Sequence, residues 1–228
     1  MAVLVLAVVA GIATSAVAER SKQLGKTRQK AQPACKPRTD AGCQITGQVT
    51  GFQRSVDGKA NLFKAQSSGR IVAWSVSLGK PSKDAREAFG EAGGTNEFGP
   101  NPTAGISILR KKSNGEFRLM RASPILKVQS YYGEKPLFTL RDPLRIKKGN
   151  IVALTTATWL PAFSVKGQTR DDVWVGSRTK KNCDITDRGL DYFFAHTKPH
   201  RKAGTDRKYK CAYTRARILY WAYLAPNR

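Results

Sequence analysis

Acidic side chains are scarce in this sequence. Its 228 residues contain 16 aspartates and glutamates against 40 lysines and arginines, which leaves a formal net charge of +24 at pH 7. Such an excess of positive charge attracts polyanions through a long-range field that salt screens. The balance therefore favours an anionic partner, such as a cell-wall polymer, an acidic polysaccharide, a lipid surface or, without sequence specificity, nucleic acid. A general adaptation for solubility is the alternative explanation.

The sequence also lacks the motifs of several enzyme classes. It contains no HExxH zinc motif, no GxxxxGK[ST] or GxGxxG phosphate loop, and no GxSxG nucleophile elbow. Its two histidines, His196 and His200, have the spacing of ligands on one helical face, but Pro199 disfavours that helix. We therefore expect no catalytic residues, no bound metal and no other cofactor.

Carboxylates provide the one enzymatic alternative. Asp171 and Asp172, beside Arg170, would suit glycoside hydrolysis, which needs two acidic side chains facing one cleft. A second acidic series, whose spacing matches no calcium-binding loop, consists of Asp184, Asp187 and Asp191. In so basic a chain we expect these acids to pair with neighbouring lysines and arginines.

Long apolar segments are limited to the N-terminus. Residues 1–13, MAVLVLAVVAGIA, form an uncharged run too short to cross a bilayer of about 30 Å comfortably. Small residues follow at Ala16 and Ala18, the positions that a signal peptidase reads. No lysine or arginine precedes the run, so an uncleaved anchor is the alternative. We predict a signal peptide over residues 1–18, no membrane span after its cleavage, and a secreted or cell-wall-associated protein.

Cysteine is rare as well. The chain has four, Cys35, Cys43, Cys183 and Cys211, an even number that suits disulfide formation in an exported protein. Four cysteines allow three pairings, and neighbours in sequence favour Cys35 with Cys43 and Cys183 with Cys211. A zinc site is the rival interpretation, but the sequence has no CxxC pair.

Short alternating runs separated by glycine, proline, asparagine and aspartate predict β-strands from Cys43 onward. In residues 70–78, alternation places Val72, Trp74, Val76 and Leu78 on one face. Residues 216–224 are apolar on both faces, which predicts a central strand covered on both sides. Further strands are expected at 47–53, 104–111, 115–122, 125–130, 136–140, 144–147, 151–156, 159–165 and 172–177.

The remaining segments complete the expected domain organisation. Residues 82–89 predict one short helix with Ser82 as its N-cap. Residues 19–42, rich in lysine, arginine and glutamine, are expected to form a flexible basic arm, because their first part has almost nothing apolar to bury. We predict a single antiparallel β-sandwich over residues 43–228, jelly-roll-like, with one inserted helix and a long disulfide-clipped loop.

That loop, residues 178–215, contains the candidate binding site. Six cations gather in its second half, and one aromatic residue lies among them. The cations are Lys198, Arg201, Lys202, Arg207, Lys208 and Lys210, and the aromatic residue is Tyr209. Cations hold phosphates or uronates while aromatic rings stack on bases or sugars, which indicates a polyanion site. A solvated charged loop is the alternative.

Three phrases of the sequence are distinctive: GRIVAWSVSLGKP (69–81), LRIKKGNIVALTTATWLPAF (144–163) and ARILYWAYL (216–224). Together they resemble an uncharacterised group of secreted bacterial proteins, a resemblance that spans residues 47–224. It implies a β-sandwich and carries no activity. The sequence thus favours a non-enzymatic module that binds an anionic polymer or glycan at the cell surface. A secreted carbohydrate hydrolase and a protein-interaction or structural module are the alternatives.

Overall fold

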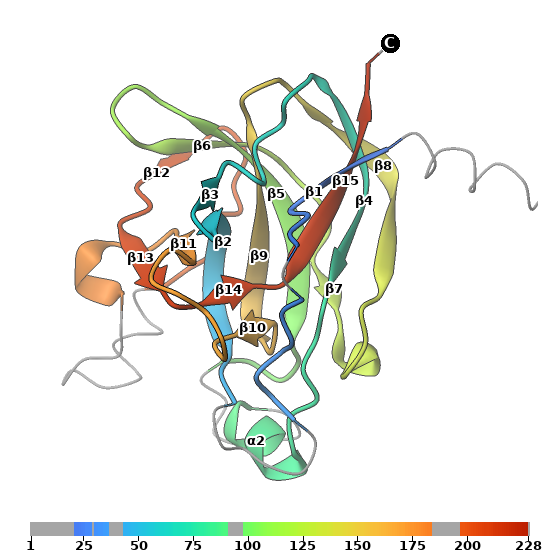
Figure 1. Ribbon diagram of the computed structural model, residues 1–228, viewed down its shortest axis with the longest axis vertical. Helices are drawn as coiled ribbons and strands as arrows, with labels where there is room; N and C mark the ends of the chain where they lie inside the picture. The colour runs from blue at the N-terminus through green and yellow to red at the C-terminus, as the bar shows by residue number, and fades with distance from the viewer. Residues whose placement is uncertain (1–20, 29, 37–42, 91–97, 184–196, 228) are drawn as a thin grey trace, which may run out of the picture.

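The computed structural model describes residues 21–28, 30–36, 43–90, 98–183 and 197–227, and it is built mainly of antiparallel β-strands (Figure 1). The smaller sheet has four strands, in the order β1 (Lys22–Leu24), β15 (Tyr220–Pro226), β4 (Gly69–Val76) and β8 (Leu137–Ile146). The predicted antiparallel β class is therefore confirmed.

The larger sheet contains nine strands. Its main path runs β12 (Asp206–Arg207), β6 (Phe117–Ala122), β5 (Thr103–Lys111), β9 (Ile151–Leu160), β2 (Thr46–Val56), β11 (Val173–Gly176) and β13 (Cys211–Thr214). Two short strands lie off this path, β3 (Lys59–Ala60) beside β2 and β7 (Leu126–Lys127) beside β5. A separate pair joins β10 (Phe163–Ser164) to β14 (Arg217–Ile218). The strand order is compatible with a jelly-roll-like arrangement, which stays a prediction.

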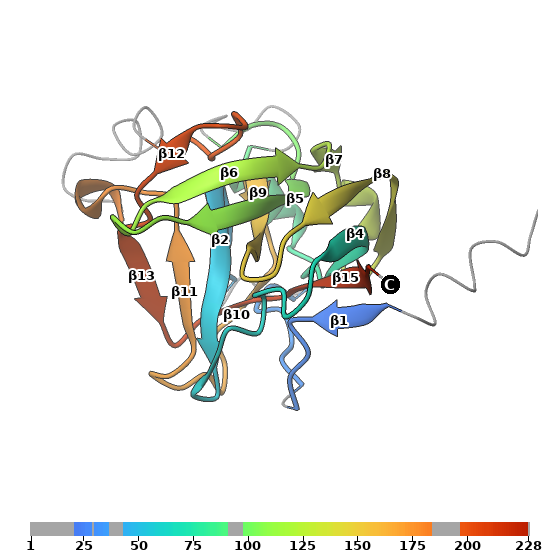
Figure 2. The same ribbon diagram turned by 90° about the horizontal axis from the view of Figure 1, so that it is seen from above.

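The main hydrophobic core lies between the two sheets. Trp74 and Tyr220 reach it from the smaller sheet, and Ile106 and Val152 reach it from the larger one. The Tyr220 hydroxyl donates a hydrogen bond of 2.8 Å to the Val152 carbonyl, so the one polar atom of that buried ring is satisfied across the layers. Figure 2 shows β5 and β6 on one side of the molecule and β15 and β1 on the other.

A β-bulge changes which residues of β4 face the core. Ala73 and Ile71 pair with the consecutive residues Tyr223 and Leu224 of β15, so Val72 is an extra residue in β4 and the simple alternation breaks at that point. Ile71 and Trp74 are buried in the core, whereas Val72 is only half-buried. The prediction that Val72 shares a face with Trp74 is therefore wrong, because Val72 is itself the extra residue of the bulge.

The two strands expected at 136–140 and 144–147 are one long strand in the structure, β8 (Leu137–Ile146). It contains Pro143, which has no backbone N–H to donate. The sheet accommodates this proline because β8 is an edge strand and the register skips between Thr139 and Leu144.

The N-terminal segment expected to be a flexible arm is instead part of the fold where the structure describes it. β1 pairs with β15 in antiparallel register, and Leu24 is buried in the core. The Arg217 guanidinium donates a 2.8 Å hydrogen bond to the Thr27 hydroxyl. The low content of apolar residues did not predict this strand, because an edge strand is held by backbone hydrogen bonds to its neighbour and needs only one buried side chain, here Leu24.

The last strand was predicted to be central and covered on both faces, which is only half correct. It is interrupted at Leu219 and continues as β15, an inner strand between β1 and β4. Tyr220 and Leu224 face the core, whereas Trp221 and Tyr223 on the other face are half-buried. Lys135 partly covers that face, with its Nζ 3.4 Å from the Trp221 ring centroid.

Two local predictions are confirmed. The short helix α2 (Lys83–Ala88) begins after Ser82, whose hydroxyl accepts a hydrogen bond from the Ala85 backbone N–H. β5 and β6 form the expected hairpin, and Gly115 in its turn has a φ of +79°. The described residues also contain the 3-10 turns η2 (Gln129–Tyr131) and η3 (Lys180–Asn182). None of the helices in the described ranges is long and apolar enough to cross a membrane.

Candidate anionic-polymer site

The predicted cations lie on a segment, residues 197–210, that crosses the outer face of the larger sheet; we call it the basic segment. Its β12 strand pairs with the edge strand β6. In its middle, the His200 backbone N–H donates to the Thr50 hydroxyl at 3.0 Å, and that hydroxyl donates to the His200 carbonyl at 3.2 Å. The basic segment is thus held by main-chain hydrogen bonds to two strands of the scaffold.

A row of buried hydroxyls on the sheet supports this attachment. Thr50 on β2, Thr155 on β9 and Ser107 on β5 follow one another at oxygen separations of 3.0 and 2.8 Å. Each hydroxyl has a single proton, and that of Thr50 goes to the His200 carbonyl, so Thr155 must donate to Thr50 and Ser107 to Thr155. The hydrogen bond from Thr50 to the His200 carbonyl therefore decides which hydroxyl donates and which accepts along the row.

The His200 side chain is structural. It is 1% exposed, and its Nε2 lies 3.1 Å from the Thr205 carbonyl, which can only accept, so this nitrogen carries the proton. Its Nδ1, 3.3 Å from the Tyr209 hydroxyl, then accepts from that group. Burial, together with the positive charge of Arg207, holds the pKa of His200 below its ordinary value. The neutral imidazole therefore stabilises the basic segment through its hydrogen bonds to Thr205 and Tyr209.

Asp206 forms its ion pairs with cations of the scaffold and not with those of the basic segment. Its carboxylate accepts from the Arg118 Nε at 2.9 Å and from the Lys112 Nζ at 2.7 Å. The hydrogen bond from Arg118, with a smaller one from Lys112, lowers the pKa of Asp206 from 3.8 to about 2. None of the six predicted cations forms a salt bridge with a carboxylate in the part of the chain that the structure describes.

Five of the six cations are exposed to solvent. These five are Lys198, Arg201, Lys202, Lys208 and Lys210. Arg207 is half-buried and donates through its guanidinium to the Lys198 carbonyl, so it closes the segment on itself. The structure therefore brings the five exposed cations together on one ordered support, with Arg207 as part of that support.

Tyr209 has a different place from the one that the sequence suggested. Its half-buried ring packs against Phe117 at 4.9 Å and Phe52 at 6.1 Å between centroids, within a small apolar cluster on the outer face of the sheet. Burial raises the pKa of its hydroxyl, which donates to His200. These contacts occupy the ring that we expected to stack on a base or sugar.

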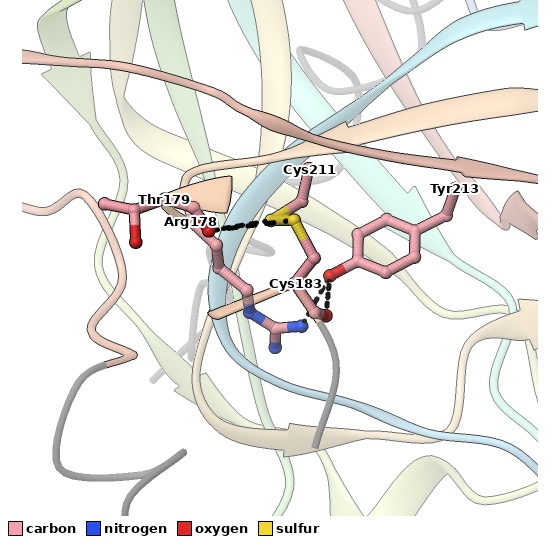
Figure 3. Close-up of a disulfide and its surroundings, with 5 residues drawn as sticks. All are labelled: Arg178, Thr179, Cys183, Cys211 and Tyr213. Carbon is pink, nitrogen blue, oxygen red and sulfur yellow. Dashed lines mark hydrogen bonds between the residues drawn. A yellow bond between two sulfur atoms is a disulfide. The ribbon is translucent and has the colours of Figure 1, made fainter. Parts of the chain in front are cut away.

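Both predicted disulfides are present, Cys35–Cys43 and Cys183–Cys211. Figure 3 shows the second, which joins the end of η3 to the start of β13. Beside it the Arg178 guanidinium donates to the Tyr213 hydroxyl at 3.0 Å, and that hydroxyl donates to the Cys183 carbonyl. In its described part, the expected long loop, 178–215, contains η3, β12 and β13, and the disulfide holds it where it returns to the sheet.

The carboxylates of the enzymatic alternative do not converge in the described residues. Asp172 is fully buried and accepts from the Thr169 N–H at 2.7 Å and the Asp57 N–H at 3.1 Å. Its neighbour Asp171 is exposed. His196 and the acidic series Asp184, Asp187 and Asp191 lie outside the described residues. Within them, no group of three or more potential metal ligands is found.

An aromatic cavity of about 570 Å³ lies next to the Cys183–Cys211 disulfide. Trp174 and Tyr213, on the adjacent strands β11 and β13, line it with Arg178 and Arg215. The two rings stack on each other at 4.3 Å between centroids, so each covers a face of the other. The Arg178 guanidinium already donates to the Tyr213 hydroxyl and the Gly47 carbonyl, so Arg215 is the exposed cation of this cavity.

Sequence reasoning missed a second group of cations. Arg70, Arg110, Arg121, Arg145 and Lys147 come from four strands and a turn and line one cavity, which we call the arginine pocket. Residues this far apart in sequence meet only through strand pairing and register. The pairing of 70 with 145 would have required knowing that β4 and β8 are neighbours.

Comparison with known proteins adds no further evidence, since no family model, curated protein or solved structure matches the chain.

Proposed function

We propose that this protein is a non-enzymatic binding module for an anionic polymer or glycan, and that the basic segment is its contact surface. The observation that carries the proposal is the set of five exposed cations on a segment fixed to the sheet, with the nearby Asp206 committed to Arg118 and Lys112. Ordering these cations in advance reduces the entropy that binding would otherwise cost.

The proposal includes export. The two disulfides suit an oxidising compartment, where anionic wall polymers and acidic polysaccharides are found. Removal of residues 1–18 as a signal peptide, and attachment to a cell surface through the polymer itself, complete this hypothesis. The resemblance to secreted bacterial β-sandwich proteins is part of the same hypothesis.

Two observations favour binding over hydrolysis or protein contacts. A glycosidase needs two carboxyl groups about 5 to 9.5 Å apart in an open cleft, and Asp172 is closed from solvent by the backbone N–H groups that it accepts from. A protein-interaction surface needs a contiguous apolar patch. The large hydrophobic side chains exposed in the described residues are only Leu126, Tyr131 and Leu137.

The test is binding of the full oxidised chain to immobilised polymers at several salt concentrations. The ligands are a phosphate-containing wall polymer, a polyuronate, a sulfated glycan, DNA and a neutral glycan. Five phosphate contacts predict a slope of about −4 for log K against log salt, from a contribution of about 0.7 to 0.9 per contact. Binding of one anionic class that persists at high salt supports a shaped site.

A matched pair of variants separates the site from diffuse charge. One replaces the five exposed cations of the basic segment by glutamine, and Arg207 stays so that the segment keeps its internal hydrogen bond. The control removes the same charge from exposed positions elsewhere, by replacing Lys26, Lys59, Lys127, Lys166 and Arg170 with glutamine. We expect a flatter salt slope and weaker binding for the first variant only, and equal losses in both would refute the assignment.

A further inference from the structure

The arginine pocket is a second basic site, separate from the basic segment. Its cavity of about 550 Å³ is lined by residues of both sheets. Arg70 and Arg145 reach it from β4 and β8 of the smaller sheet, and Arg110 and Arg121 reach it from β5 and β6 of the larger one. A volume of this size matches small-ligand sites, which span about 300 to 1,000 Å³.

Strand register places like charges opposite one another around this cavity. Arg70 pairs directly with Arg145 across β4 and β8, and Arg110 pairs directly with Arg118 across β5 and β6. Like charges directly opposite in an antiparallel pair destabilise it. Asp206 offsets the second pair through Arg118, whereas no carboxylate of the described residues forms a salt bridge with Arg70 or Arg145.

A bulge adds a further cation to the pocket. The register of β5 against β6 shifts between Ile108 and Leu109, so Met120 and Arg121, consecutive in β6, both line the cavity. Phe117 and Leu119 of the same strand belong to the outer cluster beneath Tyr209. The arginine pocket and the basic segment therefore lie on opposite faces of β6.

The turn between β8 and β9 supplies an amide side chain. Asn150 is 7% exposed and lines the pocket. Its position is fixed by a turn in which the Asn150 N–H donates to the Lys147 carbonyl at 3.0 Å and Gly149 has a φ of +88°. An amide that lines the pocket can donate to a ligand oxygen.

We infer that the arginine pocket binds a small ligand carrying two or more phosphate groups. Guanidinium forks match phosphate oxygens with paired hydrogen bonds, and Lys147 adds a point charge. Each phosphate monoester carries about −1.5 to −2 at neutral pH, so two or three such groups balance five cations, whereas one carboxylate leaves most of the charge unmet. The Asn150 amide and the Ser68 and Asn227 side chains would contact the remaining oxygens.

The probe is inorganic pyrophosphate, titrated calorimetrically into the full oxidised chain in magnesium-free buffer at fixed salt. Sulfate and a uronate disaccharide form parallel arms. We expect pyrophosphate to bind at least 10-fold more tightly than either, and Arg70→Gln/Arg145→Gln to weaken it at least 10-fold. The control Arg201→Gln/Lys202→Gln removes the same charge from the basic segment and should change the affinity less than 3-fold.

A second double variant shows whether weaker binding results from a folding defect, which circular dichroism and thermal unfolding would reveal. Arg110→Gln/Arg121→Gln alters two exposed residues on the opposite wall and should weaken pyrophosphate binding to a similar extent. Absence of binding by the wild-type chain, tighter binding of sulfate or uronate, or equal losses in pocket and control variants would overturn the inference. Loss of polymer binding in the basic-segment variant with unchanged pyrophosphate affinity would instead bear on the proposed function alone.

Discussion

Removing the Cys183–Cys211 disulfide should destabilise the protein more than removing Cys35–Cys43. The two bridges join residues separated by 28 and 8 positions. Closing a loop of n residues restricts the unfolded chain by an entropy that grows with 1.5R ln n, which gives about 3.6 kcal/mol for the longer loop and about 2.5 kcal/mol for the shorter. The difference, about 1.1 kcal/mol, depends only on the ratio of loop lengths.

The variants are Cys183→Ala/Cys211→Ala and Cys35→Ala/Cys43→Ala, so that neither leaves a free thiol. Unfolding in urea, followed by tryptophan fluorescence, gives the free energy of unfolding and its denaturant dependence for each. Cys211 and Cys35 are both buried, so the cavities left by the lost sulfurs are comparable and largely cancel in the difference. If the variant lacking the short bridge loses as much stability as the other, loop entropy does not explain the role of these disulfides.

Three further predictions concern charge. Acidification from pH 7.5 to 5.5 should lower the urea midpoint. The pKa of His200 is depressed in the folded chain, so below about pH 6.5 the unfolded chain binds a proton that the folded chain does not, and His200→Gln should reduce this pH dependence. The ionised Asp206 carboxylate stabilises the folded chain above pH 3.8, and this contribution is lost as the pH falls through about 2. Asp206→Asn should abolish this contribution, which urea midpoints at pH 5 and 2.5 would measure. Arg145→Gln should raise the free energy of unfolding by about 0.2 to 1 kcal/mol at low salt, since it removes repulsion from Arg70, and 0.5 M salt should cancel the gain.

Each of these has a clear contrary result. An unchanged pH response in His200→Gln would assign the acid sensitivity to other groups. A wild-type chain whose Asp206 carboxyl titrates near 3.8 by NMR would contradict its ion pairs with Arg118 and Lys112. A destabilised Arg145→Gln would mean that its aliphatic stem packs more favourably than its charge repels.

Local sequence patterns predicted what depends on neighbours in the chain. The helix after Ser82 follows from a capping hydroxyl, and the β5–β6 hairpin follows from a turn that needs Gly115 at positive φ. The disulfide pairing followed from proximity in sequence. In each case the deciding interaction spans only a few residues or one short loop.

Interactions between distant strands were not predictable in the same way. Val72 was assigned to the core because strict alternation does not reveal a bulge, which here depends on the pairing of β4 with β15. Tyr209 was assigned to the surface because its neighbours in sequence are polar, whereas Phe52 and Phe117, against which it packs, are far away in sequence. The arginine pocket is the extreme case, since its cations carry no shared motif and meet only in the folded sheets.

The position of β15 determines when the smaller sheet can form. The last strand of the described chain lies between β1, near the other end of the sequence, and β4, and it is hydrogen-bonded to both. During synthesis β1 and β4 therefore leave the ribosome without the strand that connects them, and Trp74 on β4 lacks the neighbouring wall formed by Tyr220 and Leu224. This layer can close only after β15 has been synthesised, so until then the nascent chain exposes apolar side chains such as Trp74 that β15 covers in the folded protein.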